Sequence, residues 1–183
     1  MKMIQLPLNS EIINNLHSGE TLLLSGMLFV ARDAAHKRLI EALDQAKPLP
    51  FDIRGQTIYY MGPSPARPGK VIGSAGPTTS GRMDIYTPRL LKDGLKGMIG
   101  KGQRSSEVKQ AIQKYQAVYL GVIGGIGALI ADTIKKSEIV AYPELGTEAI
   151  RKLEVVEFPV TVINDIYGGD LYESGRAKYF LSN

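Results

Sequence analysis

The segment TLLLSGMLFVARDAAHKRLIEALDQAKP, residues 21–48, is the clearest indication of the fold class. Its first part, residues 22–30, is an apolar run that is typical of a buried strand. Asp33 follows as a candidate N-cap, and Pro48 ends the helix that this cap begins. The side chains that recur at helical spacing on one face of that helix are His36, Leu39, Ile40 and Leu43. A strand that leads directly into an amphipathic helix is the repeating unit of an α/β fold.

The rest of the chain continues this alternation. Strands are expected at residues 58–61, 70–76, 96–102, 117–124 and 158–168, with an extended segment at 138–145. Helices are expected at residues 88–93, 105–116, 128–136 and 146–155, the second of them capped by Ser105 or Ser106. Residues 167–170, YGGD, predict a hairpin turn into 171–174. Together these elements predict an α/β layered domain.

Length and composition narrow the class further. The 183 residues predict one domain over 1–183, and 44% hydrophobic with 22% charged residues is ordinary for a soluble protein. The chain has no cysteine, which excludes disulfides, cysteine nucleophiles and an iron–sulfur cluster ligated by this chain alone. The longest apolar run, residues 117–131, is shorter than the roughly 20 residues that span a bilayer. The start of the chain lacks a signal-peptide pattern, so we expect a cytoplasmic protein without membrane contact.

The net charge of +4 does not identify the partner by itself. A pI of about 9.2 is compatible with nucleic-acid binding. However, the basic residues are spread among 18 acidic ones and form no run of five or more. A mixed, solvated surface is therefore favoured, and no nucleic acid is expected as a partner.

The loop at residues 76–83, GPTTSGRM, has the glycine spacing of a nucleotide-binding P-loop. That motif requires a lysine for the outer phosphates and a hydroxyl for magnesium, but this sequence has Arg82 and Met83 at those positions. Gly76 and Gly81 still allow a close approach of the backbone to a ligand. The Arg82 guanidinium matches a carboxylate with two parallel hydrogen bonds. The loop therefore predicts a carboxylate site rather than a nucleotide site.

Three cationic residues follow strand-like segments through small-residue loops. They are Arg32, Arg82 and Lys101. Ligands of open α/β sheets bind beyond the carboxyl ends of the strands. Side chains that follow several strands in this way can meet there, so the three cations predict a site for a doubly anionic small molecule.

The residues that carry these features resemble a known family. The segments are SGMLFVARDAAHKRL (25–39), IYYMGP (58–63), GPTTSGRMD (76–84), IGKG around Lys101, GGIGAL (124–129), and ELGTEAI followed by VVEFPV (144–160). In this order, and over about residues 22–170, they resemble the β subunit, or C-terminal part, of the iron–sulfur hydro-lyases of the class I fumarase and L(+)-tartrate dehydratase family.

The resemblance implies a three-layer swivelling β/β/α domain that works with a separate, cysteine-containing α subunit. That partner would carry a 4Fe-4S cluster on three cysteines, this chain would bind no metal, and the assembly would be α2β2. Because the chain begins near the β region, a two-subunit enzyme is expected. The implied reaction is the reversible removal of water from a 2-hydroxy dicarboxylate, with fumarate and malate as the first substrates and tartrate as the alternative.

The resemblance also implies roles for individual residues. Arg32, Arg82 and Lys101 would hold the substrate carboxylates, and Thr78 would be the base that moves the carbon-bound proton, with Thr79 able to fill either role. A free threonine hydroxyl is a very weak base and needs an activating group. Asp84 is the only carboxylate in this motif, so an acid from the α subunit is the favoured activator. A non-catalytic module that binds dicarboxylates is the other reading of the same residues.

Overall fold

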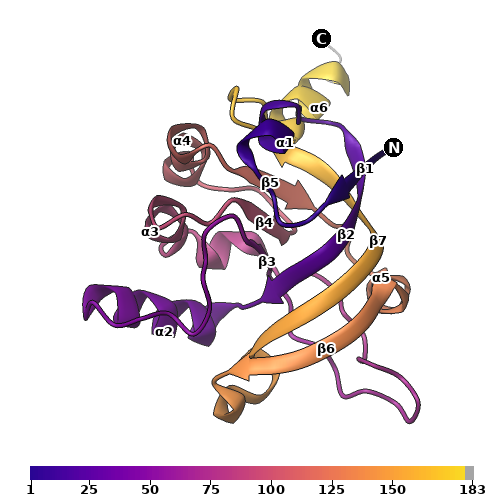
Figure 1. The fold of residues 1–183 in the computed structure, drawn as a ribbon. Helices are drawn as coiled ribbons and strands as arrows, with labels where there is room; N and C mark the ends of the chain where they lie inside the picture. The colour runs from indigo at the N-terminus through magenta and orange to yellow at the C-terminus, as the bar shows by residue number, and fades with distance from the viewer. Residues whose placement is uncertain (180–183) are drawn as a thin grey trace.

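A computed structural model describes residues 1–179 of the chain (Figure 1). Among these residues no helix is both long and apolar enough to cross a bilayer. The strands are β1 (Lys2–Gln5), β2 (Thr21–Val30), β3 (Thr57–Tyr59), β4 (Gly97–Gly100), β5 (Val118–Gly121), β6 (Ile134–Ala141) and β7 (Ile150–Asn164). The α-helices are α1 (Ser10–Asn14), α2 (Asp33–Asp44), α3 (Thr87–Lys92), α4 (Ser106–Tyr115), α5 (Gly127–Thr133) and α6 (Leu171–Tyr179). Short 3₁₀ helices are η1 (Ser80–Met83) and η2 (Pro143–Glu148).

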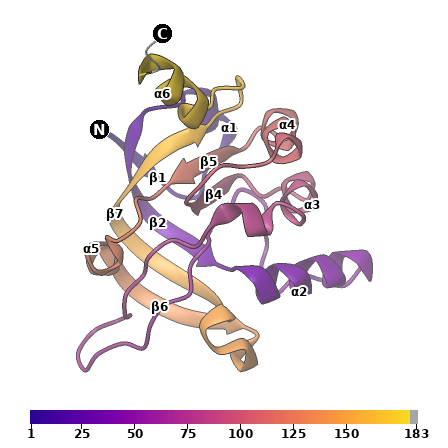
Figure 2. The same cartoon turned by 180° about the vertical axis from the view of Figure 1, so that it is seen from behind.

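The strands form a closed ring with two extensions. β2, β3, β4 and β5 run parallel, and β7 pairs antiparallel with both β5 and β2, which closes the ring. β1 extends the sheet beside β2, and β6 extends it beside β7. Figures 1 and 2 show helices α2, α3 and α4 on one side of the parallel strands, with β6 and β7 on the other side. The α/β class predicted from the sequence is confirmed.

Two hydrophobic cores lie on the two faces of the parallel strands, because successive strand side chains point to opposite faces. Leu28, Tyr59 and Leu120 belong to the core enclosed by the strands. Their chain neighbours Phe29 and Ile58 belong to the core between the strands and the helices. Of the helix face predicted for α2, His36 and Leu39 are buried, and Ile40 and Leu43 are partly buried against this core. The strand-then-helix prediction for residues 21–48 is therefore confirmed, although the N-cap of α2 is Arg32 rather than Asp33.

The helix expected at residues 146–155 is wrong. From Ile150 onward these residues form the first part of β7, a strand of 15 residues that pairs with β2 on one edge and β6 on the other. The spacing of Ile150 and Leu153 fits one face of a helix, but in the strand their side chains lie on opposite faces, Leu153 in the core enclosed by the strands and Ile150 in the core on the helix side. Pairing on both edges overrides the local preference here.

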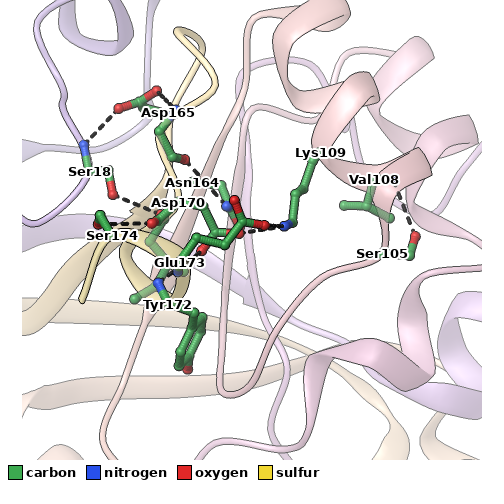
Figure 3. Close-up of polar contacts among 12 residues, drawn as sticks. Ser18, Ser105, Val108, Lys109, Asn164, Asp165, Asp170, Tyr172, Glu173 and Ser174 are labelled. Carbon is green, nitrogen blue, oxygen red and sulfur yellow. Dashed lines mark hydrogen bonds and ion pairs between the residues drawn. The ribbon is translucent and has the colours of Figure 1, made fainter. Parts of the chain in front are cut away.

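The turn expected at residues 167–170 is present, closed by an antiparallel bridge between Asn164 and Asp170, but the hairpin is wrong because α6 begins at Leu171. Asp165 accepts hydrogen bonds from the backbone N–H groups of Ser18, Tyr167 and Gly169 at 2.7 to 2.9 Å, which fixes the turn. Asp170 then accepts from Tyr172 N at 2.9 Å, as an N-cap does, and α6 follows (Figure 3). The expected strand at 70–76 is wrong as well. These residues belong to a loop that extends back to Ser64, and Ser64 and Ser74 hydrogen-bond to each other across the base of this loop.

Candidate functional site

The GPTTSGRMD loop lies across the carboxyl ends of β3 and β4. Thr78 N donates to Tyr60 O at 2.7 Å, just beyond the end of β3. Thr79 forms a parallel bridge with Lys101, just beyond the end of β4, and Ser80 N donates to Lys101 O at 2.8 Å. The structure therefore brings Thr78, Thr79 and Lys101 together, as neighbouring parallel strands that end at one edge require.

Gly100 allows this close approach at the end of β4. A Cβ atom at Gly100 would overlap Ser80 Oγ and lie 3.0 Å from Tyr60 Cδ2. The Ser80 hydroxyl, buried in that space, lies 2.9 Å from the Tyr119 hydroxyl. The loop can therefore sit on β4 only because this position has no side chain.

Replacing Gly100 with alanine is expected to lower the free energy of unfolding by about 1–3 kcal/mol, the usual cost of overpacking. Gly124→Ala is the matched control, because its Cβ would meet nothing closer than Lys101 Nζ at 3.8 Å. Urea denaturation of both variants checks the expectation. Equal stability of the two variants would show that Ser80 can move away at no cost.

Arg82 binds a carboxylate of its own chain. Its Nε donates to Asp33 Oδ1 at 2.9 Å, and its Nη2 donates to Oδ2, in the two-bond geometry that also suits a substrate carboxylate. The hydrogen bond from Arg82 holds the pKa of Asp33 below its ordinary value, against the opposing effect of burial. The Arg82 side chain is 51% exposed. Arg82 is thus pre-aligned, by an internal acid, at an edge that solvent or a ligand can reach.

Arg32 also pairs with a carboxylate of its own chain, at the other side of the α2 N-terminus, but through a single ion-pair contact. Its Nη2 lies 3.3 Å from Glu148 Oε1, and the other oxygen of Glu148 accepts from Ala34 N at 2.7 Å. The Arg32 guanidinium also packs against the backbone of Gly62, where an added Cβ would lie 2.8 Å from Cζ. Arg32 is therefore held by η2 and by the segment that follows β3.

Two acidic residues of this network, Asp33 and Glu148, do not follow from the sequence motifs alone. Asp33 is expected as a helix cap, yet its carboxylate pairs with Arg82. Glu148 lies more than 100 positions from Arg32, in a segment whose secondary structure the sequence predicts wrongly. The only signal is that both lie within segments of the family pattern.

Lys101 differs from the two arginines. It is exposed, and among residues 1–179 it has no ion-pair partner within 4.0 Å. Its Nζ lies beside the glycine turn that follows β5, 3.8 Å from the position of a Cβ on Gly124. Arg32 thus follows β2, Lys101 follows β4, and Arg82 lies in the GPTTSGRMD loop, at one edge of the sheet. The two arginines pair with carboxylates, whereas Lys101 has no such partner among residues 1–179.

Asp84 cannot serve as the activator of Thr78 in this arrangement. Its carboxylate accepts from Arg104 Nε at 2.7 Å and from Ser105 N at 2.6 Å. The Arg104 side chain has no exposed surface, donates to Thr87 Oγ1 at 2.8 Å and lies over the Tyr119 ring. Asp84 is therefore a structural partner of a buried cation, and it closes the motif onto α3 and α4.

His36 lies beneath the same loop and is a core residue. It is fully buried, its ring meets the edge of Tyr60 at 5.2 Å between centroids, and neither ring nitrogen has a partner among the described residues. The pKa of His36 is lowered from 6.5 to about 4, mainly by burial and to a smaller extent by the nearby charge of Arg104. The imidazole is therefore neutral at physiological pH.

This burial makes stability depend on pH between about 6.5 and 4. In that window the unfolded chain binds a proton at residue 36 and the folded chain does not, so the free energy of unfolding falls as the pH falls. The slope from this one group is at most about 1.4 kcal/mol per pH unit. His36→Phe should flatten the pH profile measured by urea denaturation, whereas His17→Phe, at an exposed position, should not. Identical profiles for the His36 variant and the unchanged chain would contradict the expectation.

One well-formed cavity of the structure lies away from these cations. It has a volume of about 530 Å3 and lies between the 64–74 loop and α5, where Lys70, Ile72 and Ala131 are among its lining residues. The cationic edge is instead an open surface at Arg82 and Lys101, whose side chains are exposed. A small ligand bound at this edge would need a further wall to be enclosed.

A family model described as Fumarase C-terminus matches residues 1–175 of the chain. Fumarate hydratase 2 of Leishmania major is 43% identical over 161 residues, which are 87% of this chain and 28% of that protein. The aerobic class I fumarate hydratase of Salmonella typhimurium is 43% identical over 182 residues, which are 95% of this chain and 31% of that protein. The chain thus spans less than a third of the length of these two relatives.

A third relative has almost the same extent as this chain. The putative L(+)-tartrate dehydratase subunit beta of Methanocaldococcus jannaschii is 35% identical over 179 residues, which are 94% of this chain and 92% of that protein. In that organism the matching unit is a polypeptide in its own right. The relatives therefore include both a chain of similar length and chains more than three times as long.

Proposed function

Because the chain belongs to the Fumarase C-terminus family, we propose that it is the β subunit of an iron–sulfur-dependent hydro-lyase acting on a 2-hydroxy dicarboxylate, most simply malate and fumarate. The observation that carries this proposal is the edge where Arg82 and Lys101 lie beside Thr78 and Thr79 on the ends of parallel strands. The two hydrophobic cores on either face of these strands support the finer fold assignment, a three-layer swivelling β/β/α domain.

The cations bind the two carboxylates of the substrate. Arg82 and Arg32 exchange their internal partners, Asp33 and Glu148, for a substrate carboxylate, and Lys101 offers a charge that needs no exchange. A unit charge pair at 4 Å contributes about 4 kcal/mol at an effective dielectric constant near 20, and less where water enters. Internal pairing keeps the guanidinium groups oriented before the substrate arrives, which lowers the ordering cost of binding.

Thr78 is the proposed base for the carbon-bound proton, and Thr79 donates a hydrogen bond to the substrate. The backbone of Thr78 is held just beyond the end of β3 by its N–H bond to Tyr60 O. Because Asp84 is engaged by Arg104, the group that activates the hydroxyl comes from the partner. Fixed cations at the same edge stabilise the charge that develops when the proton leaves.

The 4Fe-4S cluster belongs to the proposed α subunit, whose three cysteines would ligate it. This chain has no cysteine, and its described residues hold no group of three or more histidine, aspartate or glutamate side chains placed for a metal ion. The residues of this chain therefore do not fit the cluster, and no step assigned to them passes through it. We propose an α2β2 assembly in the cytoplasm, in which the α subunit encloses the open cationic edge.

Coexpression with a three-cysteine α subunit, without oxygen, tests the proposal. The purified chain alone should lack hydratase activity, and the complex should hydrate fumarate or dehydrate malate. A complex that forms but converts no substrate in a panel of 2-hydroxy dicarboxylates would contradict the proposal.

A tartrate dehydratase is the second candidate, favoured by the near-complete overlap with the Methanocaldococcus jannaschii subunit. Fumarate and tartrate differ in hydroxyl groups, so the same panel distinguishes the two substrates. A stand-alone binding module is the third candidate. Tight malate binding by the isolated chain in calorimetry would favour that module over the enzyme subunit.

A further inference from the structure

The backbone at Lys101 and Gly102 is held by four hydrogen bonds. Lys101 N donates to Thr78 O at 3.3 Å, and Lys101 O accepts from Ser80 N at 2.8 Å. Gly102 N donates to the Tyr172 hydroxyl at 3.1 Å, and Gly102 O lies 2.8 Å from the Tyr119 hydroxyl. Every backbone donor and acceptor of these two residues therefore has a partner. The part of Lys101 that stays free is its side chain.

The direction of the bonds at Tyr119 follows from the groups involved. A carbonyl oxygen only accepts, so the Tyr119 hydroxyl donates its single hydrogen to Gly102 O and accepts from Ser80 Oγ at 2.9 Å. Burial is the main cause that raises the pKa of Tyr119 above its ordinary value, so the phenol keeps this hydrogen. The Tyr119 hydroxyl thus connects Ser80 of the GPTTSGRMD loop to Gly102, in the turn after Lys101.

Tyr172 reaches the same turn from α6, near the C-terminal end of the chain. The first turn of α6 is fixed by Asp170, which caps Tyr172 N and lies 2.6 Å from Lys109 Nζ of α4. Lys109 also lies 2.6 Å from Glu173, so one ammonium group ties α6 to α4 at two positions (Figure 3). The Tyr172 hydroxyl is therefore presented from an anchored helix end.

Gly102 itself does not restrain the turn. Its φ of 85° lies in a region that glycine enters and leaves freely, so backbone sterics alone would let the turn change shape. The two tyrosine hydroxyls supply the restraint that the glycine lacks.

We propose that Tyr172 and Tyr119 are positioning residues for Lys101, which hold the Lys101–Gly102 backbone so that the ammonium group meets a substrate carboxylate. This inference rests on the proposed function, because it requires Lys101 to bind the substrate. It assigns a role in substrate binding to α6, a helix that contributes no residue to the cationic edge itself.

A double-mutant cycle in the coexpressed complex tests the inference. Tyr172→Phe should raise KM about five- to tenfold, the effect of one lost hydrogen bond, and leave kcat within about twofold. In the Lys101→Gln background the same substitution should have no further effect on KM, because residues that act through one another are not additive. Tyr167→Phe is the matched control, since its hydroxyl also makes one hydrogen bond to the backbone, which it donates to Asn14 O at 2.8 Å, away from this turn.

Equal increases in KM in the two backgrounds, or an equal effect of Tyr167→Phe, would overturn the inference. Amide hydrogen exchange at Gly102 in the complete chain gives a readout that does not depend on activity. Exchange should be faster in Tyr172→Phe and unchanged in Tyr167→Phe, and an unchanged rate in Tyr172→Phe would also overturn the inference. If the unsubstituted complex converts no dicarboxylate, the proposed function fails, while the exchange rate still decides whether Tyr172 holds the turn.

Discussion

Replacing Arg82 with alanine is expected to lower kcat/KM of the assembled enzyme by about 100-fold or more, the usual effect of removing one charge-stabilising donor from an active site. Stability should change by less than about 1 kcal/mol, because the Arg82–Asp33 pair is half exposed and water screens it. The two effects are separated by measuring steady-state kinetics and urea denaturation on the same variant. A large kinetic loss with little loss of stability is the result that a substrate-binding role requires.

Two further variants make this experiment specific. Arg54→Ala removes an arginine that pairs with Asp52 through two bonds at an exposed site, so it repeats the change in charge and pairing elsewhere. It should leave kcat/KM unchanged. Arg82→Lys keeps the charge but loses the planar fork, and should recover only part of the activity. Full activity of Arg82→Ala would remove Arg82 from the substrate site.

Replacing Arg104 with methionine is expected to lower the free energy of unfolding by about 3–5 kcal/mol, because one partner of a buried ion pair is lost. Asp84 would lose its bond to Nε, and Thr87 Oγ1 would lose its donor. The ring of Tyr119 would also lose the cation above its face. Urea or thermal denaturation measures the loss.

The control for this variant is Arg89→Met, which removes exposed pairs with Asp44 and Asp93 and should cost less than about 1 kcal/mol. Any activity that Arg104→Met keeps should be lower than normal, since Asp84 closes the loop that carries Thr78 and Thr79. Equal stability of the two variants would contradict the expectation. It would show that methionine packing compensates for the loss of the buried cation, which then has no net stabilising role.

The sequence predicts best where one pattern governs both local and tertiary structure. The apolar run of β2 and the helical spacing of α2 agree with each other, and the order of these two elements is confirmed. The Ser105 cap of α4 is local in the same sense, since its Oγ accepts from Val108 N three residues later. Both features depend on residues that are close together in the chain.

The sequence predicts worst where distant partners decide. The residues that pair Ile150 as a strand come from β6, and the residue that anchors Asp170 at the start of α6 is Lys109 of α4. The carboxylate partners of Arg32 and Arg82 show the same limit. Motif spacing identifies the cations and threonines of the edge, but the acids that hold the arginines depend on how η2 and α2 pack.

The proposed function requires that Arg32, Arg82 and Lys101 bind the two carboxylates of one small molecule. The crystal structure of the assembled complex with a bound dicarboxylate tests it most directly, by the distances from the substrate oxygens to these three side chains. We expect hydrogen-bond distances to Arg82 and Lys101, with Arg32 on the same ligand and the Arg82–Asp33 pair broken or shared. A dicarboxylate bound only by residues of the partner, with Arg82 still paired to Asp33 alone, would contradict it.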